Sequence, residues 1–466
     1  MRALSVIDYL FLFLEAPKQP MHVAGLCIFE IPNHASKDFV KNLVRQIKDS
    51  GGKPTFPFNQ KLHRRFFWQT DDNFDIHRHF RHVSLPTPST DALLAYISQE
   101  HGRKLGRQQP LWEFHFIDKL EPEHASAPMR FAIWLKIHHA MTDGIAAMRL
   151  LQMSLSTCSE QHTTIPFWSL FAKHRNQLDA LLPIGKPFLH IVKEQCQTIC
   201  PVGKELLCGL RQRLSSQSYF VSTFDAPKSI LNQRIGNTRH LSAHTFDKQR
   251  FANIAKAFDA TTNDVILAVC AGALRQYLSN QNALPNKPLI AFVPVSLRRD
   301  DSAVGNQISF ILTNLGTHLA DAAARLSTIK NSIDDGKRRF LRMNQAQIIN
   351  YSAITYAWAG INLATGLLPS HQAFNLIISN VPGSQQPLYL NGAKLTGIYP
   401  ASVLFDGQAL NITLANHQDK IDFGITACGT ALPNIDSLGR LLCQALTDYE
   451  RLLNKQKLPP KTHEPL

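Results

Sequence analysis

Residues 136–144 read Lys136-Ile137-His138-His139-Ala140-Met141-Thr142-Asp143-Gly144. Before the histidines, apolar residues alternate with others from Met129 to Ile137, and this period of two predicts a β-strand. After them, Ile145, Met148 and Leu151 recur at the spacing of an amphipathic helix. The strand therefore carries two adjacent histidines into a turn that ends at a helix N-terminus. We interpret this turn as the candidate active site.

The histidine pair is suited to general base chemistry, because the unperturbed pKa of histidine, roughly 6.5, lies near neutral pH. Successive side chains of a strand point to opposite faces, so only one of His138 and His139 can face a given cleft. Asp143 could orient a histidine, as the acid of a hydrolase triad does, or cap the following helix, and its local chemistry favours capping. Gly144 would let backbone approach closely. The competing interpretation is that both histidines are structural, as most of the 20 in the chain are expected to be.

Several motifs of other enzyme classes are missing from the sequence. It has no Gly-x-Ser-x-Gly elbow and no cysteine in a reactive context, which argues against a covalent acyl-enzyme. It has no Walker loop and no Gly-x-Gly-x-x-Gly after a strand. Cys196 and Cys200 could share a helix face, but no second ligand pair accompanies them, so we predict no metal site. A base without its own nucleophile suggests that the substrate supplies the nucleophile.

Composition describes a folded, basic protein. The chain has 466 residues, of which 44% are hydrophobic and 18% charged, and its length predicts two domains. Lys and Arg outnumber Asp and Glu by 49 to 35, a net charge of +14 that favours an anionic partner such as a membrane surface or CoA-like phosphates. The basic clusters are short and scattered, which argues against nucleic acid.

The chain shows neither a secretion signal nor a membrane span. The apolar run from Tyr9 to Leu14 follows Asp8, ends at Glu15 and precedes no small-x-small site, so we predict a helix begun by Ser5. No run approaches the roughly 18 to 20 apolar residues of a spanning helix. We therefore expect a cytoplasmic protein that is peripheral at the inner membrane surface or on lipid droplets.

Strands and helices interleave in both halves of the chain, which predicts layered α/β units with antiparallel or mixed sheets. Thr261 to Asp264 open a strongly amphipathic helix that we expect in the core. The predicted organisation is an N-terminal domain over 1–160, a helical connector over 161–238, a C-terminal domain over 239–454 and a tail over 455–466.

Several further motifs accompany the histidine pair. They are Gln19-Pro20-Met21-His22-Val23, Pro110-Leu111-Trp112, Thr262-Asn263-Asp264-Val265, Val293-Pro294-Val295-Ser296-Leu297-Arg298, Gly305-Asn306-Gln307, Ser379-Asn380-Val381-Pro382-Gly383 and Leu388-Tyr389. The His-His-x-x-x-Asp-Gly stretch resembles the signature of the CoA-dependent acyltransferase superfamily. The ordered set, which covers nearly the whole chain, resembles the bacterial wax ester synthase/diacylglycerol acyltransferase family.

This resemblance implies an α/β (α+β) fold: two chloramphenicol-acetyltransferase-like domains around a central channel, each a mixed sheet flanked by helices, with a helical connector. It implies an O-acyltransferase that moves a long-chain acyl group from acyl-CoA to a fatty alcohol or diacylglycerol, forming wax esters and triacylglycerol. His139 would be the base, and His138 its neighbour at the catalytic site. Acyl-CoA would be a substrate, and no cofactor is expected.

The second half would complete the site. Our candidate for the oxyanion donor is Asn263, for which helix capping is the alternative role. The family pattern implies that Asp143 is structural and pairs with an arginine, for which we select Arg298. Asp143, Gly144 and Arg298 are thus predicted as structural residues at the site. Two rival functions stay open: a condensation-type acyltransferase that uses a carrier-protein thioester, and a non-catalytic lipid-binding protein.

Overall fold

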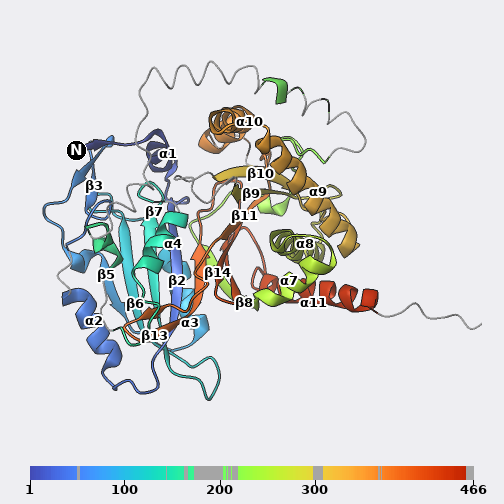
Figure 1. The fold of residues 1–466 in the computed structure, drawn as a ribbon. Coiled ribbons are helices and arrows are strands. Elements are labelled where there is room, and N and C mark those ends of the chain that lie inside the picture. The colour runs from blue at the N-terminus through green and yellow to red at the C-terminus, as the bar shows by residue number, and fades with distance from the viewer. Residues whose placement is uncertain are drawn as a thin grey trace, which may run out of the picture.

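A computed structural model describes residues 1–49, 53–142, 144–161, 166–172, 203–205, 207, 211, 219–296, 308–365, 368 and 370–457. Two six-stranded mixed sheets lie side by side, the first built mainly from the N-terminal half and the second from the C-terminal half (Figure 1). Helices flank both sheets, as the predicted fold class requires.

The first sheet has the strand order β12-β13-β2-β7-β6-β5. Its strands are β2 (His22–Glu30), β5 (Phe80–Val83), β6 (Trp112–Leu120), β7 (Arg130–His138), β12 (Tyr389–Leu390) and β13 (Ala393–Ala401). All neighbours are antiparallel except β5 and β6. The predicted strand with the histidines is β7, which lies between β2 and β6 in the interior of the sheet.

The second sheet has the order β10-β9-β11-β14-β15-β8. Its strands are β8 (Arg239–Asp247), β9 (Ile290–Ser296), β10 (Ile308–Asn314), β11 (Leu376–Val381), β14 (Leu410–His417) and β15 (Lys420–Cys428). A small third sheet joins β1 (Arg2–Ala3), β4 (Phe67–Thr70) and β3 (Gln60–His63) at the N-terminus.

Helices complete the layers. They are α1 (Val6–Leu14), α2 (Phe39–Asp49), α3 (Thr90–Gly102), α4 (Gly144–Met153), α7 (Lys248–Ala257), α8 (Thr262–Asn280), α9 (Ala322–Leu341), α10 (Gln345–Thr365) and α11 (Ser437–Lys457), with short 3-10 turns η1 (Ile76–Arg78), η2 (Phe167–Ala172) and η4 (Ile230–Asn232). The expected core helix is α8, whose residues from Val265 to Leu278 lie in the largest hydrophobic cluster. Ser5 caps α1 as predicted.

The two sheets are joined by β13. This strand comes from the second half of the chain but pairs with β2, so that it sits in the first sheet. It also lies against β15, where the Ile398 N–H donates to Asp422 at 2.8 Å. A Cβ on Gly424 of β15 would lie 1.8 Å from the carbonyl oxygen of Pro400, so this approach requires glycine.

The predicted division into domains stays a prediction. Strands β12 and β13 lie within the predicted C-terminal domain, 239–454, but they pair in the first sheet. Most of the connector, including Cys196 and Cys200, lies outside the described residues. Helix α11 continues to Lys457, past the predicted start of the tail at 455. Within the described residues, no single helix combines the length and apolar composition that crossing a membrane requires.

Candidate active site

The main chain holds both histidines at the end of β7. The His138 N–H donates to Leu111 O at 2.9 Å, and the His139 N–H donates to Met21 O at 2.8 Å. Met141 N–H then donates to His138 O at 2.9 Å, which closes the turn before α4. Neighbouring strands on both sides therefore fix the two residues.

The two faces of β7 have different surroundings. Leu135 and Ile137 belong to the cluster that includes the inner residues of α2 and α4. Trp134 packs in the cluster of α3, and Lys136 donates to the carbonyl oxygens of residues at the end of that helix. Because side chains alternate along a strand, His138 extends the α3 face and His139 extends the α4 face.

His138 is buried and held by two neighbours. The Ala140 N–H donates to its Nδ1 at 3.1 Å, so the proton of the neutral ring is on Nε2. That nitrogen faces Glu15 Oε1 at 3.6 Å. Both ring nitrogens are thus directed at protein groups, a geometry that suits a residue that positions the turn.

Glu15 follows the last residue of α1 and anchors that helix beneath the histidines. Its side chain is 1% exposed and lies 2.8 Å from Arg107 and 3.5 Å from Lys104. Burial alone would raise the pKa of Glu15, but His138, Arg107 and Lys104 outweigh it and hold the pKa at about 2. Glu15 is therefore a carboxylate throughout the neutral range.

Glu15→Gln should remove a pH-dependent part of the stability. A carboxyl with a lowered pKa stabilises the fold above its unfolded value of 4.5, and this contribution is lost as pH falls toward about 2. The shift corresponds to an unfolding free energy on the order of 3 kcal/mol at pH 7. Thermal unfolding between pH 7 and pH 3 should show a lower midpoint and a flatter pH dependence for Glu15→Gln. The exposed Glu160→Gln is the control, and equal profiles for both variants would contradict the assignment.

His139 is half-buried and lies against α1. Its ring stacks on that of Phe11, with centroids 4.1 Å apart and planes inclined by 13°. The phenyl ring covers one face of the imidazole and excludes water there. A histidine in this setting can exchange a proton with a bound substrate while the surrounding apolar groups limit competing water.

An apolar pocket lies next to the histidine turn, between the two sheets. Residues from β2, β7, α4, β11, β13 and β14 line it, namely Val23, Ala24, Gly25, Leu135, Ile137, Gly144, Ala147, Met148, Leu151, Val381, Pro400, Ala401, Ser402 and Thr413. Leu135 and Ile137 of β7 line the pocket on one side of the histidine turn, and Gly144 lines it on the other. The pocket is therefore a hydrophobic surface next to the turn that carries the predicted base.

Gly144 is the first residue of α4 and lines this pocket. In the part of the chain that the structure describes, no heavy atom lies within 4 Å of the position of a Cβ on Gly144, and the predicted close approach of backbone stays a prediction. The missing side chain leaves open space at the pocket wall. Asp143 and Arg298, the predicted structural pair, both lie outside the described residues.

Asn263 lies in the first turn of α8. Thr261 caps this helix, since its Oγ1 accepts from Asp264 N–H at 3.2 Å and Asp264 accepts from Thr261 N–H at 2.9 Å. The alternative role of Asn263 as the cap is therefore excluded. Its Oδ1 accepts from Asn380 Nδ2 at 3.5 Å, and Asn380 in turn accepts from Asn416 at 2.7 Å.

This chain of amides ties α8 to β11 and β14. Asn380 precedes Val381, which lines the apolar pocket, so the N-terminus of α8 is fixed to the strand that forms the pocket wall. The contact uses the carbonyl oxygen of Asn263. Its NH2 group is the donor that an oxyanion would need.

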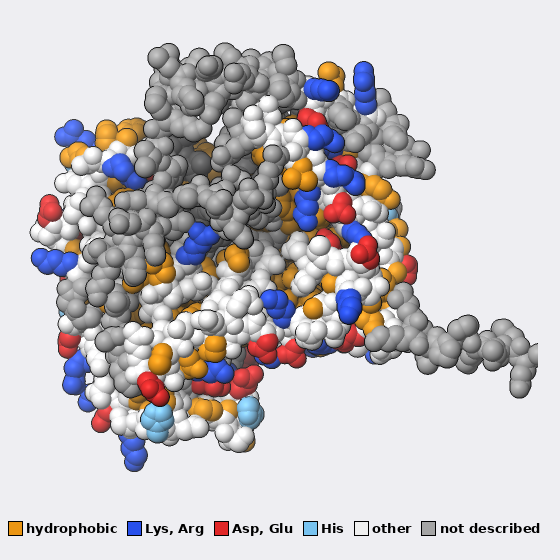
Figure 2. All heavy atoms as spheres, viewed as in Figure 1, with side chains coloured by type: hydrophobic (Ala, Val, Ile, Leu, Met, Phe, Trp, Pro, Cys, Tyr) orange, Lys and Arg blue, Asp and Glu red, His pale blue; other side chains and the backbone are white. Residues whose placement is uncertain are grey.

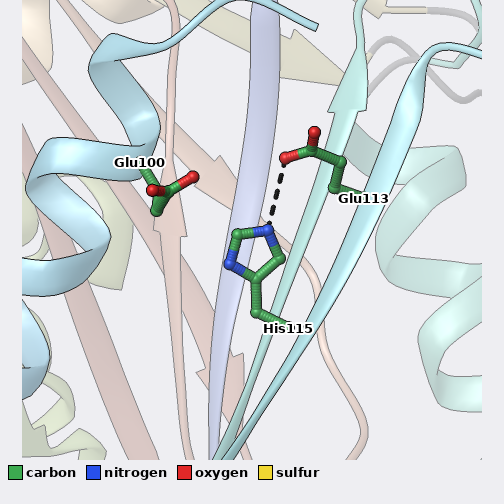
Figure 3. Close-up of side chains that lie close together, drawn as sticks. All are labelled: Glu100, Glu113 and His115. Atoms are coloured by element: carbon green, nitrogen blue, oxygen red, sulfur yellow. Dashed lines mark hydrogen bonds and ion pairs between the residues drawn. The ribbon is translucent and has the colours of Figure 1, made fainter. Parts of the chain in front are cut away.

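A second polar cluster lies behind the histidine strand, on the α3 side. Glu113 and His115 of β6 and Glu100 of α3 converge there, with His115 Nε2 3.3 Å from Glu113 (Figure 3). Arg81 bridges the two carboxylates at 3.0 and 3.4 Å. Lys136, fully buried, donates to Glu100 O at 2.8 Å.

The geometry of these three residues would suit a metal ion, but the charges do not. Arg103 also reaches Glu100, at 2.8 Å, so with Arg81 and Lys136 three cations already surround two carboxylates. Burial raises the pKa of Glu113, but His115, Lys136 and Arg81 outweigh it and lower the pKa to about 2. We interpret the cluster as an ion network that fixes α3 behind β7.

Phe11 and Glu15 are site residues that were not predicted from the sequence. Phe11 lies in an apolar run that predicted only a helix, and Glu15 follows that run. Neither residue belongs to one of the noted motifs. Their positions depend on how α1 packs over the end of β7, which no local pattern specifies. The amides Asn380 and Asn416 were missed as a pair for the same reason, although Asn380 stood in one of the noted motifs.

Comparison with known proteins identifies two matching family models. One, described as wax ester synthase/diacylglycerol acyltransferase catalytic domain, matches residues 4–266. The other, the C-terminal domain of the same family, matches residues 304–450. The O-acyltransferase WSD of Acinetobacter baylyi is 46% identical over 459 residues, which are 98% of this chain and 99% of that protein.

Solved structures give the same result. The wax ester synthase/diacylglycerol acyltransferase of Marinobacter aquaeolei VT8 is similar with a TM-score of 0.79 and 37% identity, covering 97% of this chain and 100% of that one. A starter condensation domain of rhizomide synthetase matches with a TM-score of 0.56 and 12% identity, covering 100% and 97% of the chains. At that identity the second likeness shows the fold alone.

Proposed function

The chain belongs to the wax ester synthase/diacylglycerol acyltransferase family and is an O-acyltransferase, and on this premise we propose how its site works. The acyl donor is a long-chain acyl-CoA. The acceptor is the hydroxyl group of a fatty alcohol or a diacylglycerol, and the products are a wax ester or a triacylglycerol and free CoA.

The observation that carries this proposal is the position of His139. It lies in the turn directly after β7, whose Leu135 and Ile137 line the apolar pocket, and Phe11 covers its ring. A base next to an apolar pocket suits an acceptor with one hydroxyl group and a long hydrocarbon body. The apolar walls also favour attack by the alcohol over attack by water.

The reaction proceeds by direct transfer. His139 takes the proton of the acceptor hydroxyl, and the oxygen attacks the thioester carbonyl carbon. The negative charge on the carbonyl oxygen is stabilised by the NH2 group of Asn263. The C–S bond then breaks, and the protonated imidazole returns its proton to the CoA thiolate. Bonds and charges balance without a metal or a redox cofactor, because the thioester is already activated.

The lipid substrates imply contact with a lipid phase. We therefore place the protein in the cytoplasm, associated peripherally with the inner membrane surface or with lipid inclusions. The net charge of +14 supports attraction to an anionic surface. The fatty alcohol or diacylglycerol would then reach the site without crossing water.

Thiol release tests the function. Purified protein with palmitoyl-CoA and hexadecanol should release CoA thiol, detected with a thiol reagent, in step with hexadecyl palmitate detected by mass spectrometry. Dipalmitoylglycerol as acceptor should give triacylglycerol. Activity that depends on a carrier-protein thioester and an amine would support a condensation enzyme instead, and lipid binding without thiol release would support a non-catalytic protein.

A further inference from the structure

Helix α1 has one side at the histidine turn and the other at the surface. Leu12 is buried against Trp68 and Leu111, and Phe11 stacks on His139. On the outer side, Tyr9, Leu10 and Phe13 are 41%, 47% and 63% exposed. Helix α1 therefore lies between solvent and the face of the His139 ring that Phe11 covers.

The β3–β4 hairpin extends this outer side. Phe66 is 55% exposed, and its ring stacks on Tyr9 with centroids 5.7 Å apart, while Tyr9 stacks on Phe13 at 6.3 Å. Leu4 N–H donates to Phe66 O at 3.0 Å, and β1 pairs with β4, so helix and hairpin form one unit. We call Tyr9, Leu10, Phe13, Phe66 and the 38% exposed Phe67 the outer α1 patch.

Arginines border the outer α1 patch. Arg64 and Arg65 are exposed at the tip of the hairpin, and the exposed Arg2 lies over the Phe56 ring. At the corner where Figure 1 marks the N-terminus, hydrophobic side chains lie beside Lys or Arg side chains (Figure 2). Of the nearby acids, Asp8 is used in the cap of α1 and Asp71 pairs with Lys61.

The inner end of α1 is firmly held. Arg107 donates to Leu12 O at 2.7 Å and to Glu15, and Gln19 donates to Leu14 O at 2.9 Å. Two carbonyl groups of the last turn, those of Leu12 and Leu14, are thereby satisfied without packing on the outer side. The exposed aromatic residues are thus displayed on a fixed support.

We propose that the outer α1 patch is the surface by which this protein docks on an anionic phospholipid layer. Exposed aromatic and aliphatic side chains bordered by arginines are the pattern of a helix that lies in a lipid interface. Docking there puts His139 one helix below the lipid, so that the acceptor reaches the base past Phe11. The route of the acceptor rests on the proposed function; the docking itself does not.

Vesicle flotation tests the docking. Wild-type protein and the inactive His139→Ala variant should both float with vesicles that contain phosphatidylglycerol. The double variant Leu10→Gln/Phe13→Gln should lose affinity by roughly tenfold or more, because two apolar side chains no longer leave water. Met129→Gln is the matched control, since Met129 is 46% exposed and precedes β7 at the end opposite to the histidines.

The arginines are tested separately. Arg64 and Arg65 both have positive φ. Asparagine tolerates this backbone conformation, so Arg64→Asn/Arg65→Asn removes both charges with a residue type suited to the turn. This variant should lose affinity for anionic vesicles, roughly fivefold for each charge, and keep its affinity for neutral phosphatidylcholine vesicles. All variants should keep wild-type melting midpoints.

The activity readout links docking to turnover. Leu10→Gln/Phe13→Gln should lose far more activity with vesicle-borne hexadecanol than with dissolved short-chain alcohol. Undiminished vesicle binding by this folded variant would overturn the proposal. The proposal would also be overturned if the wild-type protein bound no vesicles and formed a dimer that the same substitutions dissociate. Absence of thiol release with every substrate, with vesicle binding intact, would instead count against the proposed function alone.

Discussion

Replacing His139 by alanine should lower the rate of acyl transfer by about a thousandfold, the usual contribution of a positioned general base. His138 does not replace the lost base, since its ring nitrogens are directed at Ala140 and Glu15. Thiol release from palmitoyl-CoA with hexadecanol measures the loss. The KM for palmitoyl-CoA should change little, because the base acts on the acceptor.

The His139→Ala variant should stay folded. The side chain is half-buried, and its removal costs the stacking contact with Phe11 but leaves the main-chain bonds of β7 in place. Its melting midpoint should therefore lie within a few degrees of that of wild type. His77→Ala, at an exposed site on η1, is the matched control for loss of a histidine. Near-normal turnover by folded His139→Ala would exclude the proposed mechanism.

His138 and His139 differ in role because strand geometry places their side chains in different environments. His138 continues the face of Trp134 and Lys136, where an ion network and buried carboxylates fix α3. His139 comes next in the other alternating set, after Leu135 and Ile137, which line the pocket. The same alternation that predicts the strand from sequence therefore also separates the supporting histidine from the proposed base.

Patterns within a single element were sufficient to predict much of the fold. Alternation predicted β7, and the Thr261 to Asp264 start and helical spacing predicted α8. These elements bury an uninterrupted periodic face, so local sequence and tertiary packing agree. The strand–helix order of the two halves then predicted the mixed, helix-flanked sheets that are observed.

Contacts between distant segments could not be predicted in this way. The pairing of β13 in the first sheet was not predicted, since Gly397 and Pro400 interrupt its alternation and a bulge lies beside Gly397. Helix α10 also went unrecognised, because it has no charged residue to mark a polar face. Phe11 and Glu15 reach the histidines only through the packing of α1.

The candidate site therefore combines local sequence motifs with a pocket whose walls come from both halves of the chain. β7 and the turn after it supply the histidines, whereas β11, β13 and β14 contribute further walls of the pocket. Asn380 connects these walls to the start of α8 through Asn263. In the proposed mechanism, the second half of the chain contributes to catalysis through Asn263.

Asn263→Ala should lower the maximal rate by about 100-fold to 1,000-fold, which is the effect of removing one oxyanion donor in comparable sites. The affinity for acyl-CoA should change much less, because the carbonyl oxygen carries its full charge only in the transition state. Steady-state kinetics with palmitoyl-CoA and hexadecanol separate the two effects. The stability of α8 should change little, since Thr261 and Asp264 cap it.

Asn263→Asp distinguishes donation from positioning. Aspartate keeps an oxygen that can accept from Asn380 but lacks the NH2 group, so it should lose as much activity as alanine if Asn263 donates to the oxyanion. Recovery of most of the rate by aspartate would show that the residue acts by holding Asn380 and β11. Asn253→Ala, at an exposed site on α7, controls for the loss of an amide side chain, and an unchanged maximal rate in Asn263→Ala would remove this residue from the mechanism.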